Sequence, residues 1–184
     1  MLENAMLQHM GLTESSDSVG PVPLKTILGE EELRNLRGHF DEGVLRDMAR
    51  DLGKKLPDSK WFVDGIIEQF YTPAAYVSPK DYERAAFQRE SQLITLLMVY
   101  SRGQGLFLGI HFYWGLMVGL SLEDLVQHVM LVGAYGGIQL LNTGLTTLER
   151  TLTLLKRLAR PQEHPTPAVV VRELDVTLGT LTAR

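Results

Sequence analysis

The stretch that decides the fold is residues 104–124, which read QGLFLGIHFYWGLMVGLSLED. It joins an apolar segment that holds one histidine, His111, to the sequence GLSLED, in which Ser121 precedes two acidic residues. A serine followed by acids is typical of a helix N-terminus, because its side chain accepts a backbone hydrogen bond and the acids favour the helix dipole. We therefore expect one helix over Gly103 to Gly119 and another from Ser121 to Gly136.

Helical signals continue on both sides of this stretch. Upstream, Ser78 before Pro79 predicts the start of a helix that runs to Tyr100, because proline is favoured at the first helical position. Downstream, leucines recur at three- and four-residue spacing from Ile138 to Leu158 and predict a long amphipathic helix. Between Leu24 and Thr72 we expect three short helices, broken near Gly38 and Pro57, the third capped by Asp58 or Ser59. The fold class is therefore all-α, a compact helical bundle.

The two ends of the chain are expected to differ from the middle. Residues 1–23 mix Ser, Asp, Gly and proline and suggest an N-terminal arm. Residues 24–160 form a single all-helical domain. Residues 161–184 begin with three prolines within seven positions and continue with the β-branched run at 169–171, which predicts an extended tail. That tail is either an arm lying on another subunit or a disordered end.

Composition excludes several classes of function. The chain has 184 residues, 45% of them hydrophobic, a net charge of −4 and a pI near 5.7, so it lacks the basic footprint of a nucleic-acid-binding protein. It contains no cysteine, which excludes disulfides, thiolate nucleophiles and zinc–thiolate sites.

The apolar stretch from Leu106 to Leu120 is too short for a membrane span. An early acid and the absence of a basic segment near the N-terminus favour a cytoplasmic protein.

Four sequence elements occur in an order that is characteristic of a known family. They are Arg89 to Leu97, Gln104 to His111, Gly119 to Asp124 and Tyr135-Gly-Gly137. Together they resemble the carboxymuconolactone decarboxylase family, whose redox branch is the alkylhydroperoxidase D-like proteins. The resemblance covers roughly residues 60–158. It implies the helical fold of that family and a homo-oligomer, either a trimer or a hexamer.

The resemblance also distinguishes between the branches of the family. In the redox branch two cysteines precede the histidine, and by that spacing Gln104 and Phe107 stand in their places, while Gln92 is the counterpart of a relay glutamate. Peroxide reduction needs a thiolate, so we reject thiol peroxidase activity. The decarboxylase branch needs only charge stabilisation and a proton donor, a role that His111 could fill. Leu131 stands where decarboxylases often carry a second histidine, which leaves the substrate open.

The candidate site is centred on His111, as proton donor or acceptor, although a histidine in an apolar helix is also compatible with a core side chain bonded to a backbone carbonyl. Arg89 could clamp an anionic substrate, or belong to a solvated cluster of ion pairs. Four further residues could bind substrate, or instead be ordinary surface and core positions: Gln92, Tyr100, Gln104 and Trp114. With Phe107 in a cysteine position, they complete the candidate substrate-binding set. The five histidines, His128 among them, show no metal-ligand spacing, so we predict no metal and no cofactor.

Two hypotheses of function follow. The first is a cofactor-independent lyase or isomerase that acts on a small cyclic or unsaturated organic acid or polyketide-like compound. The second is a catalytically silent oligomeric module that binds an apolar ligand or a protein partner. Neither requires nucleic acid or a membrane.

Overall fold

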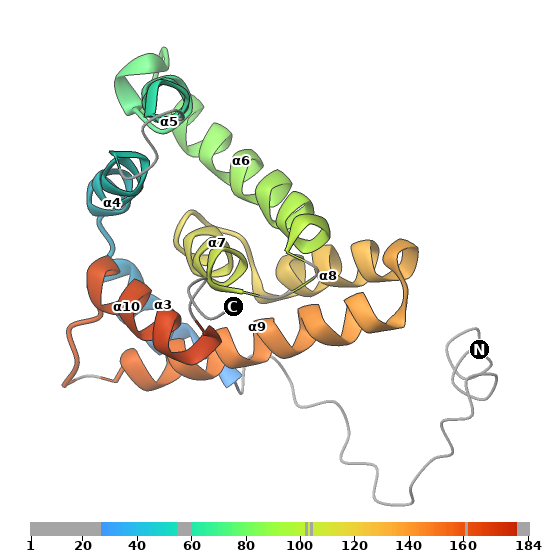
Figure 1. The fold of residues 1–184 in the computed structure, drawn as a ribbon. Helices are drawn as coiled ribbons and strands as arrows, with labels where there is room; N and C mark the ends of the chain where they lie inside the picture. Colours follow the sequence, from blue (N-terminus) through green and yellow to red (C-terminus); the bar gives the residue numbers. More distant parts are fainter. Residues whose placement is uncertain (1–26, 55–59, 102, 104, 161, 180–184) are drawn as a thin grey trace, which may run out of the picture.

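The computed structural model describes residues 27–54, 60–101, 103, 105–160 and 162–179, and every regular element in these ranges is helical (Figure 1). The all-α class is therefore confirmed for the part of the chain that is described. The elements are α3 (Glu30–Gly38), α4 (Glu42–Lys54), α5 (Lys60–Phe70), the 3-10 helix η2 (Pro73–Ala75), α6 (Pro79–Tyr100), α7 (Leu106–Met117), α8 (Leu122–Gly136), α9 (Ile138–Leu158) and α10 (Pro167–Leu178).

Local signals place the helix starts where the sequence predicts them. The Ser78 hydroxyl accepts a hydrogen bond from the backbone N–H of Asp81, with Pro79 as the first residue of α6. Ser121 and Asp124 form a reciprocal capping box at the start of α8. Both predicted starts are thus confirmed. The predicted caps of α5 and the predicted N-terminal arm lie outside the described residues.

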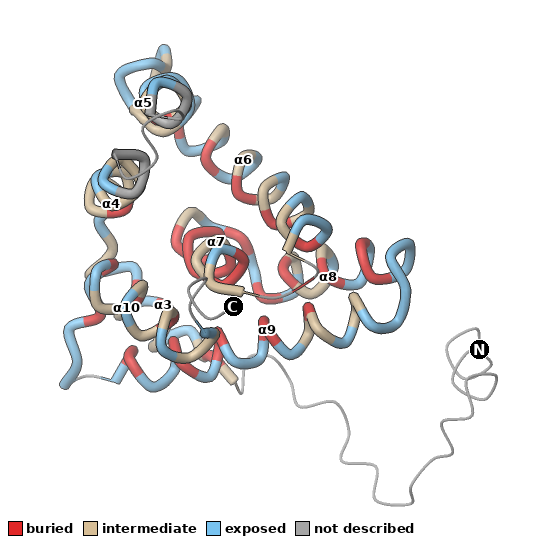
Figure 2. Tube along the Cα trace, in the orientation of Figure 1, coloured by how far each residue is buried: buried red, intermediate tan, exposed pale blue. Residues whose placement is uncertain are grey.

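Helix α7 is the centre of the core. It packs against α3, α6, α9 and α10, and Figure 2 shows buried residues along almost its whole length. Two glycines allow this close packing: a Cβ at Gly109 would overlap the Leu178 side chain of α10, and a Cβ at Gly115 would lie 2.6 Å from a methyl carbon of Leu120. A helix so surrounded can hold a polar side chain such as His111 in one fixed position.

The prediction of an extended C-terminal tail is wrong. Residues 167–178 form α10, which begins at Pro167 and packs against α9, α7 and α4. Val170 and Leu174 are fully buried, and Leu178 packs against the same core. These three residues recur every four positions, so burial of a helical stripe outweighs the strand preference of the valine run. The helical domain therefore extends past residue 160.

The described part of the chain also bears on the membrane question. None of its helices has both the length and the hydropathy that a membrane-spanning helix needs.

Candidate functional site

A buried carboxylate on α6 contacts His111, the histidine at the centre of the predicted site. Glu90 is 0% exposed, and its Oε2 lies 2.6 Å from Nδ1 of His111 on α7. A carboxylate accepts hydrogen bonds, so Nδ1 carries the donated proton and the other ring nitrogen, Nε2, is left as the group that can gain or lose one. The pair has the geometry of a histidine oriented by an acid.

The outer nitrogen of His111 differs from Nδ1 in its surroundings. Among the described residues no hydrogen bond joins Nε2 to a partner, and the side chain is 14% exposed. A histidine that contacts a buried acid through one nitrogen and keeps part of its ring exposed has the arrangement that a proton-transfer residue requires. The alternative of a core histidine bonded to a backbone carbonyl is not what the structure shows.

Arg89, next to Glu90 in sequence, holds this carboxylate in place. Its Nε donates to Glu90 Oε1 at 3.0 Å, one terminal nitrogen donates to Glu42 at 2.9 Å, and the other donates to the Phe70 carbonyl at 2.7 Å. Its guanidinium also lies over the Tyr71 ring, 3.8 Å from the centroid. With all three nitrogens engaged by the protein, Arg89 is placed to position Glu90 and not to clamp an anionic ligand.

Glu42 of α4 extends the network to Trp114. Trp114 Nε1 donates to Glu42 at 3.2 Å, and the Tyr82 hydroxyl donates to the same carboxylate at 2.5 Å. The Trp114 ring in turn stacks on His111, with centroids 5.9 Å apart and planes 7° from parallel. Trp114 therefore lies beside His111, and its ring holds the plane of the imidazole.

The pKa values of two tyrosines and of the arginine in this network are shifted upward. Burial raises the pKa of Tyr71, and the negative charge of Glu90 raises it further. Burial together with the hydrogen bond to Glu42 raises the pKa of Tyr82 to about 12. For Arg89, burial lowers the pKa, but the charge of Glu90 is among several effects that raise it, and the net shift is upward. Both phenols therefore stay neutral and the guanidinium stays charged.

The remaining sequence-predicted residues are not brought to His111 by any contact that the structure shows. Gln92 is exposed on α6, and Tyr100, at the end of the same helix, is 82% exposed. Phe107 is exposed near the start of α7. Gln104 lies outside the described residues. The α6 residue that contacts His111 is Glu90, whereas Gln92, the predicted counterpart of a relay glutamate, makes no contact with the histidine that the structure shows.

Sequence reasoning missed Glu90, although a signal was present. The buried residues of α6 recur every fourth position, namely Tyr82, Ala86, Glu90, Ile94 and Met98. A carboxylate at a position where the helical period predicts core is a buried charge, and a buried charge needs a partner. Glu42 carried no comparable signal, because its partners lie far away in sequence.

His128 has a different environment from His111. Its Nε2 lies 2.6 Å from the Ser91 hydroxyl, and its Nδ1 contacts the backbone carbonyl of Asp124 one turn earlier in α8. Both ring nitrogens are therefore used within the protein. This histidine ties α8 to α6.

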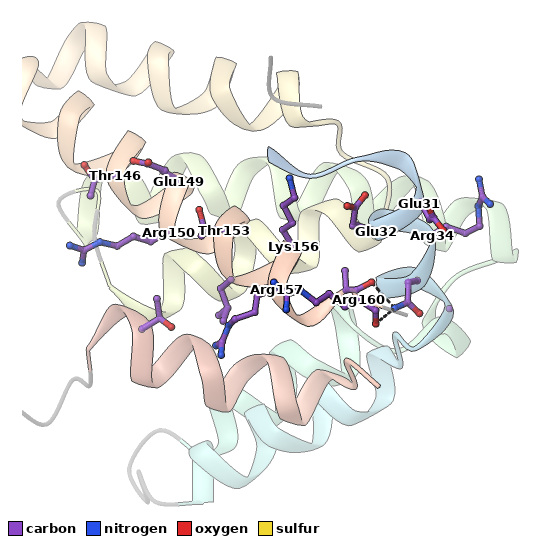
Figure 3. A pocket seen from close by; sticks show the side chains of 15 residues that line it. Glu31, Glu32, Arg34, Thr146, Glu149, Arg150, Thr153, Lys156, Arg157 and Arg160 are labelled. Atoms are coloured by element: carbon purple, nitrogen blue, oxygen red, sulfur yellow. Dashed lines mark hydrogen bonds between the residues drawn. The ribbon is translucent and has the colours of Figure 1, made fainter. Parts of the chain in front are cut away.

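A large groove lies away from this network. It has a volume of about 1280 Å³, is lined by residues of α3, α9 and α10, and its described lining contains no member of the network around His111 (Figure 3). Charged side chains are spread along it, with Arg150 and Arg34 near its two ends. Size alone therefore does not mark the candidate catalytic position.

In comparisons with known proteins, no protein-family model, no curated protein and no solved structure matches the chain. The described part of the chain defines an all-helical protein in which a buried glutamate contacts a partly exposed histidine. Function is therefore argued from these residues.

Proposed function

We propose that the protein is a cofactor-independent, non-redox enzyme similar to the carboxymuconolactone decarboxylases. It acts as a lyase or isomerase on a small cyclic or unsaturated organic acid or polyketide-like compound. One observation carries the proposal: Glu90 orients His111 through Nδ1 and leaves Nε2 without a protein partner among the described residues. His111 then exchanges a proton with the substrate.

The charges of the network restrict how such a substrate is oriented. Arg89 is shared by Glu42 and Glu90, so the region behind His111 holds two carboxylates and one guanidinium. A substrate carboxylate placed against this region would be repelled. The carbonyl or ring carbon of the substrate therefore faces His111, and its carboxylate points away from Glu90.

The test is proton transfer to carbon, followed by NMR in D₂O. A panel of unsaturated lactone acids, β-keto acids and polyketide-like enones is incubated with the full chain. We expect deuterium incorporation, isomerisation or loss of CO₂ for at least one compound, abolished by His111→Gln and retained by the matched variant His128→Gln. Turnover that survives His111→Gln would reject the role of His111, and no turnover with any compound would favour the silent module.

The silent oligomeric module remains the second candidate because of one specific observation. Large apolar side chains are exposed where α6 and α8 end and α9 begins, namely Leu96, Val99, Tyr100, Leu131, Tyr135 and Ile138. Figure 2 shows the exposed turn between α8 and α9. Such a surface suits burial between subunits, in a trimer or hexamer, or contact with an apolar ligand. Native mass spectrometry separates these outcomes by the mass of the assembly and of any released molecule.

The cytoplasmic location remains a prediction.

A further inference from the structure

Two histidines that are far apart in sequence meet on the surface between α3 and the segment that leads into α10. His39 follows the last residue of α3, and His164 lies in the segment before α10. Their ring centroids are 5.3 Å apart, and His164 Nδ1 lies 3.2 Å from His39 Nε2. Neither ring belongs to the network around His111.

The orientation of His39 is fixed by the protein. Its Nδ1 lies 3.0 Å from the backbone carbonyl of Asn35. A carbonyl can only accept, so Nδ1 carries the hydrogen, and in the neutral ring Nε2 presents its lone pair towards His164. The Asn35 side chain in turn donates to the carbonyls of Ala159 and Arg160 and joins α3 to the end of α9. An imidazole whose other nitrogen donates to a backbone carbonyl is the arrangement found around metal-binding histidines.

The distance between the two nitrogens matches two ligands of one metal ion. Two nitrogens bound at the usual zinc distance in a tetrahedron are about 3.3 Å apart, and those of His39 and His164 are 3.2 Å apart. In the structure this contact is a hydrogen bond, in which the His164 Nδ1–H donates to the lone pair of His39 Nε2. His164 is exposed, so its hydrogen can move to Nε2 through solvent, which leaves the Nδ1 lone pair for the ion. We propose that His39 and His164 bind one divalent transition-metal ion that prefers imidazole, such as Zn²⁺, Ni²⁺ or Cu²⁺.

The rest of the coordination shell comes from solvent or a bound ligand. The described residues contain no group of three or more His, Cys, Asp or Glu side chains that could hold a metal ion. Asn35, whose carbonyl holds His39, also lines the large groove, together with Gly38 and Arg160 (Figure 3). The open positions of the ion are therefore next to a groove that contains guanidinium groups, and a small anion could bridge the two. The ion also cross-links α3 to the segment before α10.

The experiment uses the untagged full chain, stripped with a chelator and dialysed, because an affinity tag of histidines would bind the same ions. Isothermal titration with Ni²⁺ and Zn²⁺ is expected to show one saturable site per chain, and the melting temperature is expected to rise with each ion. His39→Gln and His164→Gln should each lose the site and the shift. His128→Gln, which replaces a histidine whose two ring nitrogens both bond within the protein, is the matched control and should retain both.

Three results would overturn the proposal: no saturable binding of Ni²⁺, Zn²⁺ or Cu²⁺ by the unaltered chain, unchanged binding by the double variant His39→Gln/His164→Gln, or loss of binding in His128→Gln. Circular dichroism without metal shows whether each variant folds. Should a variant unfold, Cu²⁺-induced broadening of ring NMR signals in the unaltered chain replaces it. We expect the His39 and His164 signals to broaden first, and broadening confined to other histidines would reject the site.

Discussion

His111 and His128 contact neighbouring residues of the same helix, yet the structure gives them different capacities. Glu90 of α6 lies 2.6 Å from one ring nitrogen of His111. Ser91, the next residue, lies 2.6 Å from one ring nitrogen of His128. For His128 the second nitrogen is bonded to a helix carbonyl, whereas for His111 it has no partner among the described residues. The comparison shows that a histidine is a candidate for proton transfer when the fold leaves one of its two ring nitrogens without a hydrogen-bond partner.

The largest effect that separates the two histidines should be on catalysis. For a compound that the protein turns over, we expect His111→Gln to lower kcat/KM by about 10²- to 10⁴-fold, the usual contribution of a general acid or base. His128→Gln should change it by less than about tenfold. The measurement is the rate of deuterium incorporation or product formation by NMR. Equal losses in the two variants would remove the distinction between the histidines.

The acid partner of His111 should matter more to stability than the hydroxyl partner of His128. Glu90→Ala removes a buried carboxylate that contacts Arg89 and His111, and should lower the free energy of unfolding by about 3–5 kcal/mol. Urea unfolding measures it. A loss below about 1 kcal/mol would mean that the pair is solvated and not buried.

The next largest effect on stability is expected where α10 packs against α7. Leu174 of α10 is fully buried, and Leu174→Ala should cost about 2–5 kcal/mol of unfolding free energy, because it leaves a cavity in the core that positions His111. The matched control is Val176→Ala, at an exposed position of the same helix. Urea unfolding that finds equal, small losses for both would support an extended arm in place of α10.

A smaller effect is expected at the other histidine. Ser91→Ala removes one neutral hydrogen bond to His128 and should cost about 1 kcal/mol by urea unfolding, with turnover unchanged. A loss of turnover comparable to that of His111→Gln would show that the Ser91–His128 pair takes part in the chemistry.

The last effect appears only at alkaline pH. Because the folded pKa of Tyr82 is raised to about 12, above its ordinary value near 10, the hydroxyl contributes stability that is complete below pH 10 and is lost as the pH rises towards 12. Urea unfolding at several alkaline pH values should therefore show falling stability. Tyr82→Phe should reduce the slope, and an unchanged slope would contradict the raised pKa.

Sequence predicted the helices well because helix starts are local. Ser78-Pro79 and the capping box at Ser121 each lie within a few residues of the elements they begin. Helix α10 was not predicted, because its valine run favours a strand and only burial against distant helices favours a helix. Local sequence patterns therefore predict helices that begin at a local capping signal better than they predict a helix, such as α10, that is stabilised by packing against distant helices.

The candidate site was predicted in part. The sequence names His111 and Trp114 as candidates but does not name Glu90, whose burial depends on packing between α6 and α7. The metal site proposed at His39 and His164 was not predicted, because the two residues are 125 positions apart and show no local ligand spacing. Both cases depend on which distant residues the fold brings together.

The most direct test of the central claim is the position of the proton on His111, measured by ¹⁵N–¹H NMR of the imidazole rings in histidine-labelled protein. We expect the hydrogen of His111 to stay on Nδ1, where Glu90 accepts it, with Nε2 as the nitrogen that gains and loses a proton, and we expect Glu90→Gln to alter this pattern. A His111 ring that carries its hydrogen on Nε2 and leaves Nδ1 bare would contradict the claim that Glu90 prepares this histidine for proton transfer.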